Sequence, residues 1–110
     1  MTGTMPLEID VAQLHAMRRA GEPLVVLDVR EPWELDICKL DDSLDVPMRT
    51  IPARVGDVPR DRPVVVLCHH GGRSANVTAW LRQQGFGNAT NLQGGIHAWA
   101  RQIDPSMKVY

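Results

Sequence analysis

The chain has 110 residues and a formal net charge of -1, with 44% hydrophobic and 23% charged residues. These values fit one globular domain, so we expect residues 1–110 to form a single domain. The sequence has no basic stripe and no run of the roughly 18–20 apolar residues that a membrane span needs. Nucleic acid and membrane are therefore not expected as partners. The N-terminal stretch lacks the apolar core of a signal peptide, so we expect a cytoplasmic protein, in which thiols stay reduced.

The first half of the chain alternates between short strands and helices. Its predicted elements are an extended piece at 7–9, a helix after the N-cap Asp10, a buried parallel strand within 23–30 that ends near Asp28, and a short helix at 31–38. Apolar residues recur at helical spacing after Asp10 until Gly21 stops the helix. Pro32 suits the first turn of the next helix. This half therefore predicts a strand–helix–strand–helix order.

The second half continues the alternation. Its predicted elements are a weak strand at 42–47, a broken helix or loop at 47–59, a strand within 62–68, a helix at 73–87, a short strand at 88–93 and a last helix at 94–102. Pro52 is expected to interrupt the broken segment. Residues 64–67 are β-branched or apolar, which is typical of a buried strand. The whole pattern predicts an α/β fold, a mostly parallel five-stranded sheet with helices on both faces. Residues 1–5 and 106–110 are expected to fray.

Cysteine use argues against both a disulfide framework and a metal site. Cys38 and Cys68 can form at most one bridge, and no C-x-x-C or Cys–His zinc spacing is present. His69 and His70 follow Cys68 directly, and three adjacent residues in one tight loop cannot easily reach a single tetrahedral ion. We therefore expect no metal and no organic cofactor. His97 is expected to be an ordinary surface or packed helix residue, and the role of Cys38 is left open, with an inert thiol favoured over a second redox thiol.

The loop after the 62–68 strand carries the chemistry. Ligands of doubly wound sheets bind beyond the carboxyl ends of the strands, and Cys68 lies at such an end. Gly71 and Gly72 allow successive N–H groups to curl inward, and the next helix adds its positive N-terminal end. A thiol in that setting ionises readily and becomes a nucleophile, so we expect an ionised and exposed sulfur. The alternative is that Cys68 is one more small apolar residue at the end of a buried strand.

Three stretches resemble the rhodanese family of thiosulfate sulfurtransferases. They are VVLDVREPWEL (25–35), VVVLCHHGGRSANVTAWLRQQGF (64–86) and NLQGGIHAW (91–99). The resemblance implies a single rhodanese-like domain in which Cys68 accepts sulfane sulfur from thiosulfate or a similar donor. The resulting persulfide would pass its outer sulfur to cyanide or a thiol. The implied partners are a small anionic donor, one of these acceptors, and in one version a sulfur-accepting protein.

Eight further residues are candidates for the site. They are His69, His70, Gly71, Gly72, Arg73 and Ser74 in the loop, with Asp28 and Arg30 in support. Arg73 is expected to add a permanent positive charge. The two histidines either polarise the donor, supply only backbone N–H groups, or have no role. Ser74 is expected to cap the helix in preference to bonding the sulfur. The resemblance suggests that Asp28 and Arg30 brace the site, and the alternative is an ordinary solvated pair.

Loop length separates two chemistries of this fold. Cys68 through Arg73 is a six-position loop, as in the sulfurtransferase branch, whereas the related phosphatases have one residue more. Sulfur transfer is therefore favoured over a phosphatase or arsenate reductase. A persulfide carrier that serves a partner protein needs the same loop and stays open. The family usually shows Gly-His-Ile-x-Gly-Ala after its first signature, but this chain reads DICKLDDSLDVP, so the structure of 38–46 is not predicted.

Overall fold

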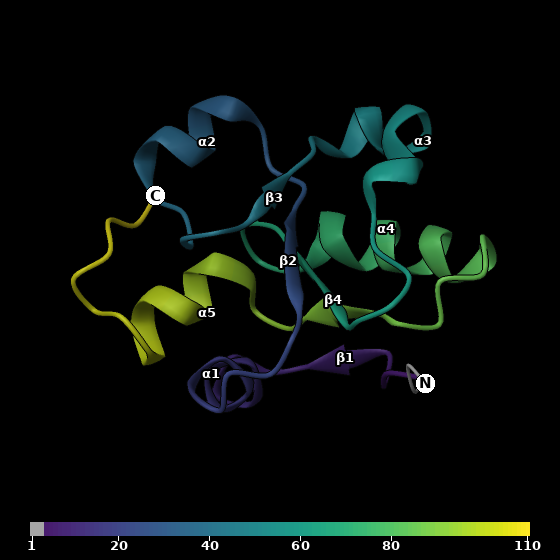
Figure 1. The fold of residues 1–110 in the computed structure, drawn as a ribbon. Coiled ribbons are helices and arrows are strands. Elements are labelled where there is room, and N and C mark those ends of the chain that lie inside the picture. Colours follow the sequence, from purple (N-terminus) through teal and green to yellow (C-terminus); the bar gives the residue numbers. More distant parts are fainter. Residues whose placement is uncertain (1–3) are drawn as a thin grey trace.

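The computed structural model describes residues 4–110, and its centre is a five-stranded sheet in the order β1-β5-β4-β2-β3 (Figure 1). The strands are β1 (Glu8–Ile9), β2 (Val25–Asp28), β3 (Leu44–Asp45), β4 (Val64–Leu67) and β5 (Ala89–Leu92). Each neighbouring pair is parallel. The predicted α/β fold with a parallel five-stranded sheet is thus confirmed.

Within residues 4–110, four helices connect successive strands and a fifth follows β5. They are α1 (Val11–Arg19), α2 (Pro32–Ile37), α3 (Ile51–Arg54), α4 (Gly72–Gln83) and, after β5, α5 (Gly95–Gln102). Short 3-10 turns at Met48–Thr50 and Val55–Asp57 flank α3. The predicted broken helix at 47–59 is confirmed. The role expected for Pro52 is wrong, because Pro52 lies in the first turn of α3, where a missing N–H costs nothing. Within residues 4–110, no helix is long and apolar enough to cross a bilayer.

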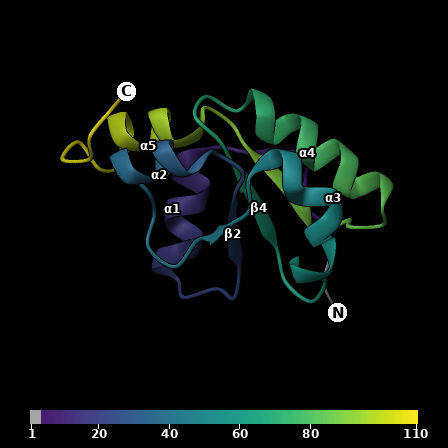
Figure 2. The ribbon, with the colours of Figure 1, turned by 90° about the horizontal axis from the view of Figure 1, so that it is seen from above.

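The helices cover both faces of the sheet, with α1 and α5 on one side and α3 and α4 on the other (Figure 2). Alternate side chains of β4 pack into the two hydrophobic cores, one on each face of the sheet. Val65 and Leu67 pack with residues of α1 and α5, whereas Val64 and Val66 pack with residues of α3 and α4. All four side chains are fully buried, so β4 is a rigid central support for the residue that follows it, Cys68.

The segment that departs from the family pattern is held by polar contacts. Asp45 accepts hydrogen bonds from Lys39 at 2.6 Å and from the Ser43 hydroxyl at 2.6 Å. Asp42 has a φ of 65°, a left-handed conformation that aspartate tolerates better than most residues. The segment then enters β3, in which Leu44 is paired with Leu27. A tight turn and a two-residue edge strand therefore replace the glycine-containing pattern.

The C-terminal segment folds back against α2 and the loop after β4 instead of fraying. It runs from the end of α5 to the neighbourhood of α2 (Figure 1). The Tyr110 ring stacks on His69, with ring centroids 3.8 Å apart, and its hydroxyl donates to Glu34 at 2.6 Å. The expectation that residues 106–110 fray is wrong. The same expectation is wrong for Met5, because its N–H donates a hydrogen bond to the carbonyl of Gly87. Residues 1–3 of that expectation lie outside the described residues.

Candidate active site around Cys68

Two hydrogen-bond donors converge on the sulfur of Cys68. The Gly71 N–H lies 3.1 Å from Sγ, and the Ser74 hydroxyl lies 3.2 Å from it. Gly71 has a φ of 109° and is the N-cap of α4, so the loop turns sharply enough to aim its N–H back at the sulfur. The preference for Ser74 as a helix cap is wrong, because its hydroxyl faces the thiol and the cap position belongs to Gly71. Both donors can stabilise negative charge on sulfur.

The sulfur is not exposed in this conformation. Cys68 is only 1% accessible and packs with core residues such as Val29 and Val77. The expectation of an exposed thiol is therefore wrong. Cys68 directly follows the buried strand β4, and the loop folds over it so that the Gly71 N–H comes within hydrogen-bond distance of the sulfur. The interpretation as a small core residue is right about packing but misses the two donors. Access to the sulfur requires a movement of the loop or of its neighbours.

The N-terminus of α5 holds the loop in place. The Ile96 N–H donates to the Cys68 carbonyl at 2.9 Å, and the His97 N–H donates to the His69 carbonyl at 3.0 Å. Gly95, with a φ of 60°, fits so closely that a Cβ there would lie 2.5 Å from each of these carbonyl oxygens. Sequence reasoning missed this contact. Its signal was the Gly-Gly pair in the 91–99 stretch, which was interpreted only as a helix entrance.

Arg73 is engaged by a buried carboxylate. Its two terminal nitrogens donate to Glu34 at 2.7 and 2.8 Å, and Glu34 is 2% exposed. Arg73 and the Tyr110 hydroxyl lower the pKa of Glu34 to about 2, against the effect of burial, and Glu34 in turn raises the pKa of Arg73. The positive charge expected from Arg73 is present, but the carboxylate of Glu34 neutralises it. Glu34, which sequence reasoning did not select, is therefore part of the site.

Asp28 and Arg30 form a fully buried ion pair. Their side chains are 0% exposed and 2.8 Å apart, so the interpretation as a solvated pair is wrong. Arg30 also donates to the Cys38 carbonyl at 2.9 Å and to the Tyr110 hydroxyl oxygen at 3.1 Å. Burial opposes the charge of Arg30, but its bonds to Asp28 and Tyr110 raise its pKa overall. Through Tyr110 and Glu34, this pair is linked to the loop, which supports a bracing role.

The remaining loop residues differ in exposure. Gly72 is exposed as the first residue of α4, and His70 is exposed above the loop. His69 is half-buried beneath Tyr110, and burial lowers its pKa, with His70 lowering it further. The structure therefore brings every loop candidate to the carboxyl end of β4, but only Gly71 and Ser74 among them donate hydrogen bonds to the sulfur within residues 4–110.

Comparison with known proteins identifies the architecture. Residues 10–102 match the rhodanese-like domain. This chain belongs to the rhodanese-like domain family. A sulfurtransferase of Allochromatium vinosum is 43% identical over 94 residues, which cover 86% of this chain and 88% of that protein. A rhodanese-related protein of Thermoplasma volcanium has a TM-score of 0.81 and 33% identity, covering 89% of this chain and 94% of that one.

A larger relative matches this chain over one part of its length. The probable adenylyltransferase/sulfurtransferase MoeZ of Mycobacterium tuberculosis is 41% identical over 93 residues, which cover 83% of this chain. The matched region is 24% of MoeZ. A domain similar to this chain therefore occurs both in a protein of comparable length and as a minor part of a longer one.

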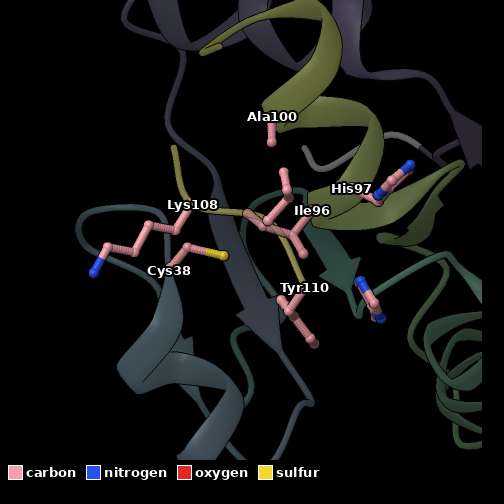
Figure 3. A pocket seen from close by; sticks show the side chains of 8 residues that line it. Cys38, Ile96, His97, Ala100, Lys108 and Tyr110 are labelled. Carbon is pink, nitrogen blue, oxygen red and sulfur yellow. The ribbon is translucent and has the colours of Figure 1, made fainter. Parts of the chain in front are cut away.

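A small cavity lies beside the loop of this rhodanese-like domain, between α5 and the C-terminal segment (Figure 3). Its lining residues are Cys38, His69, Ile96, His97, Ala100, Lys108, Val109 and Tyr110. Its side chains leave no room for a water-sized sphere, so this cavity is not a substrate pocket in this conformation. It brings Cys38 and His97, which are far apart in the sequence, to the same side of the site.

Proposed function

We propose that this protein is a sulfurtransferase with Cys68 as its nucleophile. The Cys68 thiolate attacks the sulfane sulfur of thiosulfate, a new S–S bond forms, and the old one breaks as sulfite leaves with the electron pair. Cyanide or a thiolate then attacks the outer sulfur of the Cys68 persulfide. Thiocyanate or a new persulfide is released, and the cysteine thiolate returns. The electrons balance without any metal or organic cofactor.

One observation carries this proposal: the Gly71 N–H and the Ser74 hydroxyl both point at Cys68 Sγ at the carboxyl end of β4. Each state of the cycle places negative charge on sulfur, first on the thiolate and then on the persulfide. Preorganised donors stabilise such charge without having to reorient during the reaction. The family membership supports the same chemistry, because the matched region contains the whole loop.

We assign positioning roles to the other predicted site residues. Asp28 and Arg30 fix the strand end and the C-terminal segment, and Arg73 with Glu34 ties α4 to α2. His69, His70 and Gly72 supply the backbone of the loop. Because Cys68 is 1% exposed, a donor reaches the sulfur only when the loop or its cover opens. Such gating steps are common in enzymes that protect a reactive intermediate from water.

The phosphatase and arsenate reductase alternatives are disfavoured by the loop. It has six positions, and both terminal nitrogens of its arginine are bound to Glu34. A phosphate-binding loop instead needs an arginine whose donors are available to the anion. Hydrolysis of an aryl phosphate by wild type, but not by Cys68→Ser, would revive that alternative.

A second candidate is a persulfide carrier that delivers sulfur to another protein. The occurrence of a 41% identical region within the larger MoeZ favours it. Both functions form the same Cys68 persulfide, so they differ only in the second step. A carrier would release sulfur slowly to cyanide or small thiols and much faster to its protein acceptor. The natural acceptor is not needed to test the first function.

The test is thiosulfate:cyanide turnover of the full chain after dialysis against a chelator. Wild type should release thiocyanate and sulfite in equal amounts, and Cys68→Ala should be inactive. Cys38→Ala is the matched control and should retain activity, since Cys38 does not take part in the cycle. Activity in Cys68→Ala, or its loss in Cys38→Ala alone with the fold intact, would contradict the assignment.

We also retain a single domain over 1–110 and a cytoplasmic location as predictions.

A further inference from the structure

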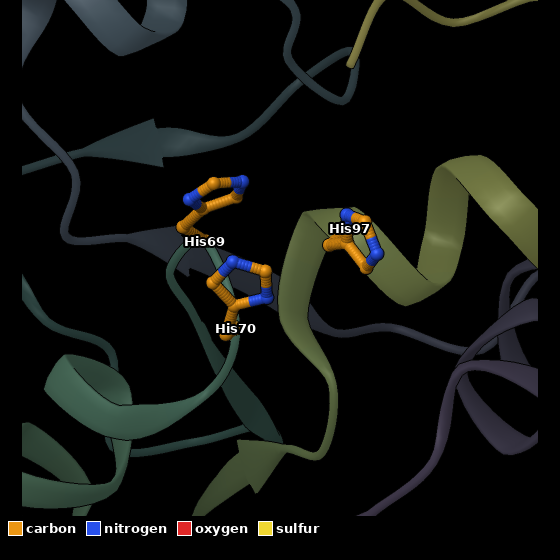
Figure 4. A group of neighbouring side chains, drawn as sticks. All are labelled: His69, His70 and His97. Carbon is orange, nitrogen blue, oxygen red and sulfur yellow. The ribbon is translucent and has the colours of Figure 1, made fainter. Parts of the chain in front are cut away.

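Three of the four histidines gather at one point of the surface. His69 and His70 come from the loop after β4, and His97 comes from the first turns of α5 (Figure 4). One ring nitrogen from each lies within 4.8 Å of the other two. The fourth histidine, His15, lies elsewhere with its ring against Trp99. The sulfur-transfer cycle proposed above uses none of these three imidazoles.

Two nitrogens of this cluster are buried without a partner. Within residues 4–110, neither His69 Nε2 nor His97 Nδ1 has a hydrogen-bond partner. Buried polar atoms of native proteins are almost always paired, so each unpaired ring nitrogen is free to bind a water, an ion or another ligand.

We propose that His69, His70 and His97 bind a divalent transition-metal ion such as Zn²⁺. Imidazole nitrogens suit Zn²⁺, Cu²⁺ and Ni²⁺, and three histidines leave one coordination position open. The oxygen ligands that Mg²⁺ and Ca²⁺ prefer are absent from this three-histidine set. The open position can hold water or a small anion next to the loop that contains Cys68.

A backbone hydrogen bond holds the two elements of this site together. The His97 N–H donates to the His69 carbonyl at 3.0 Å, so α5 and the loop hold the backbones of these two half-buried ligands at a fixed separation. Tetrahedral Zn²⁺ with Zn–N bonds of ~2.0–2.1 Å needs nitrogens roughly 3.3 Å apart. The exposed His70 can adjust by side-chain rotation. The rings of His69 and His97, whose centroids are 6.1 Å apart, must also turn toward the ion. The prediction of no metal considered only Cys68, His69 and His70, whereas the structure supplies a third imidazole from a different element.

The test is Zn²⁺ titration of chelator-stripped protein in competition with a chromophoric chelator. Wild type should bind one Zn²⁺ per chain, and His70→Ala and His97→Ala should each bind about tenfold or more weakly. His15→Ala is the matched control and should bind as wild type does. Cys38→Ser/Cys68→Ser should also retain binding, because no thiolate belongs to the site.

Circular dichroism and thermal unfolding check that each variant folds. If His97→Ala does not fold, the exposed His70→Ala variant decides. Absence of Zn²⁺ binding, binding that survives His70→Ala and His97→Ala, or binding that disappears in the double cysteine variant would overturn the site. None of these readouts depends on sulfur transfer, so the metal site and the proposed function fail separately.

Discussion

The substitution Gly95→Ala should damage both the stability of the fold and the shape of the Cys68 loop. The new Cβ would lie 2.5 Å from the carbonyl oxygens of Cys68 and His69, which are backbone atoms and cannot turn away. α5 must therefore shift. That shift weakens the bonds that the N–H groups of Ile96 and His97 donate to the same two carbonyls.

The expected loss of stability has two parts. The left-handed conformation at Gly95 costs a substituted residue roughly 1–2 kcal/mol. The two weakened hydrogen bonds add about 1 kcal/mol each. We therefore expect the free energy of unfolding to fall by about 3–4 kcal/mol. Gly21 provides the matched control, because it has a φ of 69° but a Cβ added there would meet no atom within 4 Å. Gly21→Ala should lose only the conformational part.

Urea unfolding measures the loss of stability, through the transition midpoint at unchanged slope. Intact-mass analysis after a thiosulfate pulse measures how fast the folded protein gains sulfur. Gly95→Ala should lose clearly more stability than Gly21→Ala and should gain sulfur more slowly, while Gly21→Ala should react as wild type does. Equal losses of stability in the two variants would refute the close contact between α5 and the loop.

Three other predictions concern the charged network and the donors to the sulfur. The pKa of Glu34 is lowered from 4.5 to about 2 by Arg73, so its stabilising contribution is complete above pH 4.5 and is lost as the pH falls toward 2. Urea unfolding between pH 6 and 3 should therefore show a weaker acid dependence for Glu34→Gln than for the exposed control Glu22→Gln, and equal slopes would contradict this. Arg30→Met leaves a buried carboxylate unpaired and should cost about 3–5 kcal/mol in unfolding, whereas the exposed Arg101→Met should be nearly neutral. Ser74→Ala removes one donor to the sulfur and should slow persulfide formation about tenfold, as followed by mass; a wild-type rate would exclude that role for its hydroxyl.

Much of the fold follows from local patterns in the sequence. The apolar run at 64–67 and the helix after it depend on neighbouring residues only, so β4 and α4 could be placed from periodicity. The loop between them then had to lie at the carboxyl edge of the sheet. The two-residue strands β1 and β3 carry little local signal, and their pairing with β5 and β2 is fixed by the sheet as a whole.

The parts that sequence reasoning missed are contacts between distant segments. Tyr110 reaches Glu34 across 76 positions of the chain, and no local pattern indicates that a terminal tyrosine stacks on a loop histidine. His97 joins the two loop histidines only because α5 packs against the loop. The burial of Cys68 was predicted only as the alternative to an exposed thiol, because burial results from the cover that the surrounding core and loop provide together.

The most direct test of the account is intact-mass analysis of the chain after incubation with thiosulfate, followed by peptide mapping. We expect a gain of one sulfur atom, located on the peptide that contains Cys68 and removed by cyanide. The Cys68→Ala variant should show no gain. A gain located on Cys38, or no gain with thiosulfate or any other sulfane donor, would contradict a sulfurtransferase built on Cys68.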